Sequence, residues 1–320
     1  MKKKAKIYKP TKSSMQSGLM KTKEWVLEYI VHNEQINPLM GWQSSSNTLS
    51  EVKMSFDTKD DAINYAIFSG GKRFRAFLVI QAAKLFEIPK IRALQAASAI
   101  ETTHTYSLVH DDLPSMDNDD IRRGKPTVHI KWDEATAVLV GDALQAFAYQ
   151  ILSDKKTHPN SEVRLHLIKT LSEASGHNGM VLGQSKDLEA EKNLNSLQLK
   201  DIINLQKLKT GALFRWSLRS ASILAEEKND HLKIYAEAIG LAFQIKDDLL
   251  DHEGTTEKIG KKVGKDSQAG KATLVSILGV ENAKKRCLEL CDEACESLNL
   301  FGKKSEMLKT AARFTIERGF

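Results

Sequence analysis

A long apolar segment that ends in a run of carboxylates constrains the fold of this chain most. Residues 91–113 are Ala-rich and apolar, with the pattern of a helix, and residues 111–117 read Asp-Asp-Leu-Pro-Ser-Met-Asp. Carboxylates beside an apolar helix are costly unless water or a cation faces them. The fold must therefore open, at the end of this helix, onto solvent or onto a bound positive charge.

The spacing of the carboxylates predicts how the chain turns there. Asp111 and Asp117 are six residues apart, or about 240° around a regular helix, so they would not share a face. Pro114 lies between them and interrupts the helical hydrogen bonds, so we expect a turn that brings Asp117 back. Downstream, Asp247 and Asp251 are four residues apart and share a face already. Either cluster alone could equally be an acidic cap or a solvated loop.

The rest of the pattern predicts an all-α protein. No strand alternation persists, and no shift in composition marks a domain boundary. We assign residues 21–320 to one helical domain, and residues 1–20, which are rich in Lys, Ser and Thr, to a disordered basic arm or an overlong start. Residues 189–196 look like a linker. The expected later helices cover 62–68, 76–86, 136–152, 163–174, 197–208, 212–225, 232–250, 274–298 and 305–318.

Charge and hydropathy exclude several classes of protein. Much of the net charge of +6 comes from the lysines at the start of the chain, so it does not indicate nucleic-acid binding. The basic arm has no apolar core typical of a signal peptide, and no apolar run approaches the roughly 20 residues that span a bilayer. We therefore expect a cytoplasmic protein without membrane insertion.

Three cysteines recur every four residues, at positions 287, 291 and 295. On a helix they share a face with Leu288, Ala294 and Leu298, which predicts a buried stripe. A metal site is the alternative, but neither a histidine nor a fourth cysteine accompanies them.

Basic residues follow two glycine-rich breaks. Residues 70–75 read Gly-Gly-Lys-Arg-Phe-Arg at the expected start of a helix, where free N–H groups and guanidinium forks suit an anion. Residues 260–266 form a Lys-rich, Gly-flanked loop that could close over an anionic ligand. Taken alone, each of these basic segments is more commonly a set of solvated surface charges than a binding site.

Five motifs in this order resemble the trans-isoprenyl diphosphate synthases, specifically the bacterial farnesyl diphosphate synthases, from about residue 21 to the C-terminus. The resemblance implies a helical bundle of the isoprenoid synthase type around a deep cavity, usually homodimeric. It also implies head-to-tail condensation of isopentenyl diphosphate with dimethylallyl or geranyl diphosphate. The motifs are residues 70–75, Asp111 to Asp117 with Arg122-Arg123-Gly124, Gly183-Gln184 with Asp187, Lys209-Thr210-Gly211, and Phe243-Gln244 with Asp247-Asp248 and Asp251.

The resemblance also implies roles for individual residues. Three Mg²⁺ ions would bind carboxylate oxygens and bridging phosphates, the environment that this ion prefers. Their ligands would be Asp111, Asp112 and Asp117 for two ions and Asp247 for the third, with Asp248 and Asp251 contributing through water or indirectly. The allylic diphosphate would contact Arg122, Lys209, Lys261, Thr210, Gln244 and Asp187. Isopentenyl diphosphate would contact Gly71, Lys72, Arg75, His104 and Arg123. Catalysis itself would depend on Asp111, Asp117, Arg122, Lys209, Asp247 and Lys261.

Product length is a further expectation. Tyr106 lies five residues before Asp111, about 7.5 Å deeper along the helix axis, where a bulky ring would form a cavity floor. Tyr106 with Ser107, and the two extra residues within the first acidic motif, resemble the farnesyl synthases. The alternative is that Tyr106 is simply a core aromatic residue.

Several positions depart from the family pattern without removing a proposed ligand. They are Ala76 in place of proline, Leu182 in place of glycine, Lys186 in place of an apolar residue, and Leu274-Val275 in place of an aromatic-proline pair. Rival functions are a geranyl or geranylgeranyl synthase, a terpene cyclase, or a non-catalytic partner subunit. Such subunits tend to lose one acidic cluster, and this chain keeps both.

Overall fold

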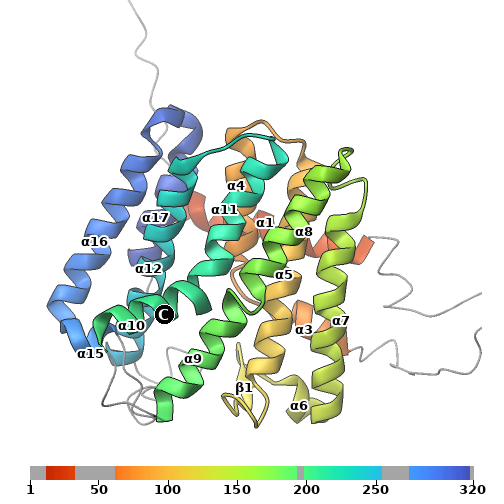
Figure 1. Ribbon diagram of the computed structural model, residues 1–320, viewed down its shortest axis with the longest axis vertical. Helices are drawn as coiled ribbons and strands as arrows, with labels where there is room; N and C mark the ends of the chain where they lie inside the picture. Colours follow the sequence, from red (N-terminus) through yellow and green to blue (C-terminus); the bar gives the residue numbers. More distant parts are fainter. Residues whose placement is uncertain (1–11, 33–61, 193–197, 254–273, 318–320) are drawn as a thin grey trace, which may run out of the picture.

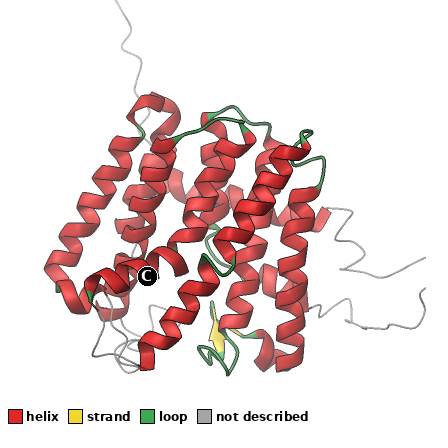
Figure 2. Cartoon of the chain, in the orientation of Figure 1, coloured by secondary structure: helices red, strands yellow, loops and turns green. Residues whose placement is uncertain are grey.

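The computed structural model describes residues 12–32, 62–192, 198–253 and 274–317, and in these ranges the fold is all-α, as expected (Figures 1 and 2). A single two-stranded hairpin interrupts the helices of the described ranges. The elements are α1 (Lys12–His32), α3 (Ala62–Phe68), α4 (Phe74–Leu85), α5 (Lys90–Asp111), β1 (Ile121–Arg122), β2 (Lys125–Pro126), α6 (Val128–Lys131), α7 (Glu134–Ser153), α8 (Ser161–Ser175), α9 (Met180–Lys192), α10 (Leu199–Lys209), α11 (Gly211–Leu224), α12 (Asp230–Glu253), α15 (Leu274–Leu278), α16 (Val280–Ser297), the 3₁₀ segment η2 (Asn299–Ser305) and α17 (Glu306–Glu317).

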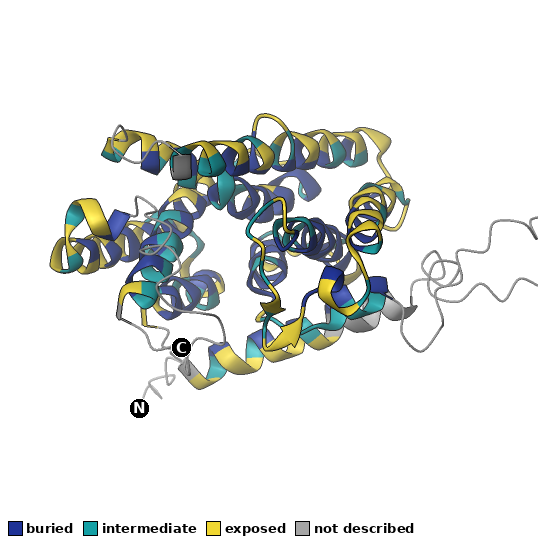
Figure 3. Ribbon diagram, turned by 90° about the horizontal axis from the view of Figure 1, so that it is seen from below, coloured by how far each residue is buried: buried dark blue, intermediate teal, exposed yellow. Residues whose placement is uncertain are grey.

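Helix α5 is the central element of the bundle. It packs against α7 on one side and α4 on the other, and 15 of its 22 residues are buried. Small residues such as Ala96, Ala97 and Ala99 let the neighbouring helices approach closely. Figure 3, which shows the molecule from below, has mostly buried helices in the interior and exposed faces on the outside. Helices α5 and α12 both end at the same lower end of the bundle, which brings the two acidic segments together (Figure 1).

The first helix begins earlier than the sequence indicated. We placed residues 1–20 in a disordered arm, but α1 starts at Lys12, so this prediction is wrong for residues 12–20; residues 1–11 lie outside the described part. The reason is a buried stripe at helical spacing, in which Met15, Leu19 and Val26 pack into the core. Helix α1 contacts α4, α5 and α17 through this stripe.

Two other local predictions need correction, and one short hairpin was not predicted. Helix α9 continues to Lys192, so residues 189–192 are helical and not a linker. Gly279, with φ of 77°, divides the expected helix 274–298 into α15 and α16. Arg123 and Gly124 both have positive φ, 54° and 74°, which is the backbone that closes a two-residue β-hairpin between β1 and β2.

The cysteine stripe is buried, as expected. Cys287 and Cys291 are 4% and 5% exposed, Cys295 is half-buried, and Ala294 and Leu298 are fully buried beside them. Leu288 was wrongly placed in this stripe: it is 58% exposed, because the next residue along a helix points about 100° away. In the described ranges, no three His, Cys, Asp or Glu side chains are close enough to enclose a metal ion together.

Helix α7 is more apolar than the sequence analysis allowed. By length and composition alone it could cross a membrane, contrary to our expectation that no segment would. In the structure it packs against α5 through Ala137, Val140 and Leu144. Its other side leaves Val138 and Leu139 exposed.

Candidate active site

A cavity of about 780 Å³ opens at the end of the bundle where α5 and α12 terminate. Asp111 and Asp117 line it from the end of α5 and the turn that follows, and Asp247 lines it from α12. Lys209, Thr210 and Gln244 complete the polar part of the wall. The structure thus brings together acidic residues up to 136 positions apart in the chain, with Lys209 beside them.

The first acidic turn has the geometry expected from Pro114. Helix α5 ends at Asp111, and the backbone N–H of Asp117 donates to the carbonyl oxygen of Asp111 over 2.8 Å. The N–H of Asn118 likewise donates to Leu113 over 3.1 Å. These bonds fold residues 112–117 back onto the helix end, so Asp117 returns to the cavity beside Asp111.

The carboxyl of Asp111 lies in surroundings that fit a cation. Its pKa is raised from 3.8 to about 6, mainly by burial; Lys209 and Arg122 lower the pKa, and the neighbouring Asp117 and Asp112 raise it. An ionised carboxylate is therefore disfavoured here unless a positive charge joins it. Mg²⁺ usually takes one or two carboxylates together with substrate phosphates, so a group of three preassembled ligands is not required. The residues present fit Mg²⁺ that arrives with a diphosphate.

Asp112 is placed differently from its two neighbours. Its Oδ1 atom lies 2.6 Å from both Nε and Nη2 of Arg122, and Asp119 lies 3.7 Å from the same guanidinium. Asp112 is buried beneath the β-hairpin and does not border the cavity that Asp111 and Asp117 share. The structure thus pairs Asp112 with Arg122, whose guanidinium it directs toward the cavity.

The basic side of the cavity is held by acidic partners that lie behind it. Lys209 Nζ lies 2.5 Å from Asp187 Oδ2. Gly183 lets α9 reach the end of α10, because a Cβ atom there would lie 2.2 Å from the backbone nitrogen of Lys209. Asp251 lies one turn beyond Asp247, half-buried and outside the cavity lining, and Lys261 lies outside the described residues.

A relay of hydrogen bonds orders the α12 side of the cavity. Thr210 Oγ1 donates to Gln244 Oε1 over 3.1 Å, and Gln244 Nε2 donates to Asp248 Oδ1 over 2.8 Å. The backbone N–H of Leu274 donates to the other oxygen of Asp248 over 3.0 Å. Asp248 is 6% exposed, so it orients Gln244 from inside the protein.

A second, smaller pocket of about 180 Å³ adjoins the first. Arg75, His104 and Phe243 line both hollows, so the two share a wall. Five residues expected to act together, Gly71, Lys72, Arg75, His104 and Arg123, all line this smaller pocket. Arg73, which also lines it, was part of the basic motif 70–75 but was given no role of its own. The sequence analysis missed the other two polar residues, Glu101 and Thr315, because they come from separate segments.

Burial and crowding set the charges of the basic pocket. Burial lowers the pKa of Arg75 and of Arg123 to about 10, which leaves both guanidiniums charged at neutral pH. Burial, helped by the surrounding arginines, holds the pKa of His104 well below 6.5. The imidazole is therefore neutral, and its Nε2 atom lies 3.0 Å from Nη1 of Arg75, which donates to it. This concentration of fixed cations suits a diphosphate.

Tyr106 and Ser107 line the large cavity from α5. The Tyr106 side chain is 5% exposed and meets the ring of His110 edge-on, with centroids 6.0 Å apart. Its place in the wall, deeper than Asp111, agrees with a floor, although its effect on product length stays a prediction. Ala76, one of the departures from the family pattern, donates its N–H to Glu101 Oε1 over 3.1 Å, a bond that proline could not make.

A family model described as polyprenyl synthetase matches residues 57–311 of the chain. The chain belongs to this family. A second model, NADH dehydrogenase ubiquinone Fe-S protein 4, matches residues 4–74, which is less than a quarter of the chain, so it does not show membership.

Individual relatives of this chain are also prenyl diphosphate synthases. It is 42% identical over 266 residues to farnesyl diphosphate synthase of Escherichia coli (strain K12), covering 81% of this chain and 88% of the relative. It is 40% identical over 262 residues to geranylgeranyl diphosphate synthase of Cyanophora paradoxa, covering 81% and 87%.

Solved structures show the same fold. An FPP/GFPP synthase from Zymomonas mobilis superposes with a TM-score of 0.77 at 40% identity, covering 95% of this chain and 98% of the other. A geranyltransferase from Helicobacter pylori, described as complexed with magnesium and isoprenyl diphosphate, gives a TM-score of 0.74 at 28% identity, with the same coverage. These findings confirm the expected family, the isoprenoid synthase fold and an enzyme that transfers prenyl groups.

Proposed function

We propose that this polyprenyl synthetase joins isopentenyl diphosphate head to tail to dimethylallyl and then geranyl diphosphate, giving farnesyl diphosphate and free diphosphate. One observation supports this most strongly: a cavity with two acidic clusters shares a wall with a separate basic pocket. Two diphosphates can then lie side by side, with the reacting carbons between them. A terpene cyclase, which ionises one diphosphate, would have no use for the second pocket.

In this proposal the large cavity takes the allylic diphosphate. Arg122 and Lys209 bind its phosphate oxygens, positioned by Asp112 and Asp187. Thr210 and Gln244 add hydrogen bonds, and Lys261, which lies outside the described residues, is a further ligand implied by the family resemblance. Asp111, Asp117 and Asp247 would hold three Mg²⁺ ions, with Asp251 in support. The H. pylori relative described as complexed with magnesium and isoprenyl diphosphate supports this assignment.

When bound, Mg²⁺ supplies Lewis-acid stabilisation of the departing diphosphate. The side chains of the protein do the rest. Arg122 and Lys209 neutralise the charge that develops on the leaving group, because preorganised cations act strongly in a partly buried site. Lys72, Arg75 and Arg123 hold isopentenyl diphosphate with its double bond facing the allylic carbocation.

Apolar side chains protect the reaction from water. Leu113, Leu213 and Phe243 line the cavity between the diphosphate sites and the core, so water is kept from the carbocation. After the new carbon–carbon bond forms, a proton leaves the adjacent carbon, and the released diphosphate is its acceptor. Tyr106, with Ser107, forms the floor that stops elongation at fifteen carbons.

We also propose that the enzyme is a cytoplasmic homodimer. The apolar helix α7 leaves Leu139 45% exposed and Val138, which also borders the large cavity, 42% exposed. A second copy that covers this face would bury them, as is usual for two-fold interfaces. Sedimentation of the purified protein tests this, since a monomer at micromolar concentration contradicts it.

A product assay tests the proposed reaction. Purified protein is incubated with Mg²⁺, isopentenyl diphosphate and either dimethylallyl or geranyl diphosphate, and the prenyl chains are resolved by length. We expect a fifteen-carbon product. A ten- or twenty-carbon product would leave the chemistry intact and move the floor away from Tyr106. No product, with diphosphate binding retained, would contradict the reaction and favour a modulatory partner subunit.

A further inference from the structure

The turn that presents Lys72 and Arg75 has a backbone that local contacts do not explain. Gly70, Gly71 and Arg73 all have positive φ, at 106°, 97° and 51°. For a residue with a side chain, such as Arg73, the left-handed conformation costs about 1–2 kcal/mol. Arg73 is also the N-cap of α4, yet its side chain does not cap that helix. Contacts from elsewhere in the fold must hold the turn.

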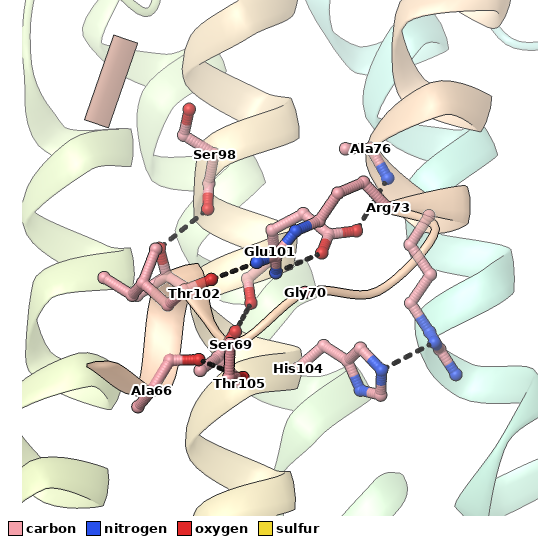
Figure 4. Close-up of polar contacts among 12 residues, drawn as sticks. Ala66, Ser69, Gly70, Arg73, Ala76, Ser98, Glu101, Thr102, His104 and Thr105 are labelled. Atoms are coloured by element: carbon pink, nitrogen blue, oxygen red, sulfur yellow. Dashed lines mark hydrogen bonds and ion pairs between the residues drawn. The ribbon is translucent and has the colours of Figure 1, made fainter. Parts of the chain in front are cut away.

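A single carboxylate on α5 supplies these contacts (Figure 4). Arg73 is 3% exposed, and its Nη1 atom lies 3.2 Å from Oε2 of Glu101, while Nη2 donates to the carbonyl oxygen of Ile67 at the end of α3. The other oxygen of Glu101 accepts the N–H of Ala76, in the first turn of α4, over 3.1 Å. Glu101 therefore binds the side chain of the turn and one of the free N–H groups at the start of the helix.

The charge of Glu101 also matters to the basic pocket. It is the sole carboxylate among the side chains that line this pocket, beside Lys72, Arg73, Arg75 and Arg123. An isolated carboxylate there would repel a diphosphate, but Arg73 pairs with it at 3.2 Å. Burial lowers the pKa of Arg75 and of Arg123, and the negative charge of Glu101 opposes that effect on both. Glu101 thus helps both arginines to stay protonated.

We propose that Glu101 is a positioning residue for isopentenyl diphosphate: through Arg73 and the Ala76 N–H it fixes the turn that presents Lys72 and Arg75 to the diphosphate. Glu101 acts through its neighbours and does not contact the reacting carbons. The inference rests on the proposed assignment of the basic pocket to isopentenyl diphosphate.

The test compares Glu101→Gln with a matched control. Glutamine keeps the shape of the side chain and one acceptor oxygen but removes the charge. Thr102→Val is the control, since Thr102 is equally buried, next to Glu101, and donates within its own helix to Ser98 over 2.8 Å. We expect Glu101→Gln to raise KM for isopentenyl diphosphate about tenfold, the effect of losing one charge-assisted contact. KM for geranyl diphosphate should stay within about twofold, and Thr102→Val should change neither.

Hydrogen exchange gives a readout independent of activity. Amides of residues 70–77 should exchange faster in Glu101→Gln than in Thr102→Val, because the single acceptor oxygen of glutamine cannot replace both contacts, the one to Arg73 and the one to the Ala76 N–H. Should Glu101→Gln fold poorly, Arg73→Lys serves instead, because a point charge cannot reach both Glu101 and Ile67, and the same selective rise in KM is expected.

Two outcomes would overturn the inference: equal rises in both KM values, or unchanged exchange in residues 70–77. A parallel Lys72→Ala variant separates the positioning role of Glu101 from the assignment of the basic pocket to isopentenyl diphosphate. If Lys72→Ala leaves KM for isopentenyl diphosphate unchanged, the assignment of the pocket fails. If Lys72→Ala raises that KM and Glu101→Gln does not, the pocket assignment stands and the positioning role of Glu101 is rejected.

Discussion

Replacing Asp111 by asparagine should make the metal-free protein more stable while removing its activity. Burial raises the pKa of the Asp111 carboxyl from 3.8 to about 6 in the folded protein. Between these values the folded state holds more protons than the unfolded state, so stability falls as pH rises from about 4 to about 6. Above pH 6 the whole penalty is present, and a neutral asparagine avoids it.

The size of the effect follows from the shift. A difference of about two pH units, at about 1.4 kcal/mol each, gives an upper bound of about 3 kcal/mol at pH 7. Because Asp111 is half-buried, solvent screening lowers this, and we expect a gain of about 2 kcal/mol for Asp111→Asn. At pH 5 the gain should fall to about half, since the wild-type carboxyl is then largely protonated.

Thermal unfolding in the presence of a chelator measures this prediction. The Tm of Asp111→Asn at pH 7 should exceed that of the wild type by about 3 °C. Asp120→Asn, which changes an exposed carboxylate in the same acidic stretch, is the control and should alter stability by less than about 0.5 kcal/mol. Adding Mg²⁺ and diphosphate should stabilise the wild type and not Asp111→Asn. If Asp111→Asn is no more stable than the wild type at pH 7, burial of the ionised Asp111 carboxylate does not destabilise the folded protein, and the argument is refuted.

Three further substitutions test individual parts of the site. Tyr106→Ala should lengthen the product beyond fifteen carbons, and loss of the buried ring should reduce stability by about 3 kcal/mol. If chromatography shows an unchanged product, Tyr106 does not form the cavity floor. Gly71→Ala should raise KM for isopentenyl diphosphate at least about tenfold, because φ is 97° and the new Cβ would lie 2.5 Å from a guanidinium carbon of the pocket. Gly124→Ala, with φ of 74° and open space around it, is the matched control for backbone strain, and an equal effect there would contradict the clash. Asp187→Asn should raise KM for the allylic diphosphate about fivefold, because Lys209 loses a partner 2.5 Å away. Steady-state kinetics should show this rise while KM for isopentenyl diphosphate stays unchanged.

Local patterns in the sequence were enough to predict the helices. Helical periodicity placed α3, α4, α5, α7, α8, α10, α11 and α12 within a few residues of their observed ends, because amphipathic spacing is a property of each segment alone. It did not predict α6 or α9. Pro114 predicted the return of Asp117, since proline acts on its own turn of backbone. The buried stripe of Met15 and Leu19 was missed, because a Lys-rich composition outweighed a short apolar pattern.

For the candidate active site, too, some features follow from the sequence and others only from the tertiary structure. The sequence by itself determined which residues carry charge: the acidic clusters around Asp111 and Asp247, and the basic turn before α4. Only the tertiary structure decided how each charge is used. Asp112 pairs with Arg122 beneath the hairpin, while Asp111 beside it faces the cavity, although the two are adjacent and chemically identical. Glu101, with no motif to mark it, binds the basic turn from another helix. The reason is physical: the partners of a buried charge are set by the packing of elements far apart in the chain, which local spacing does not encode.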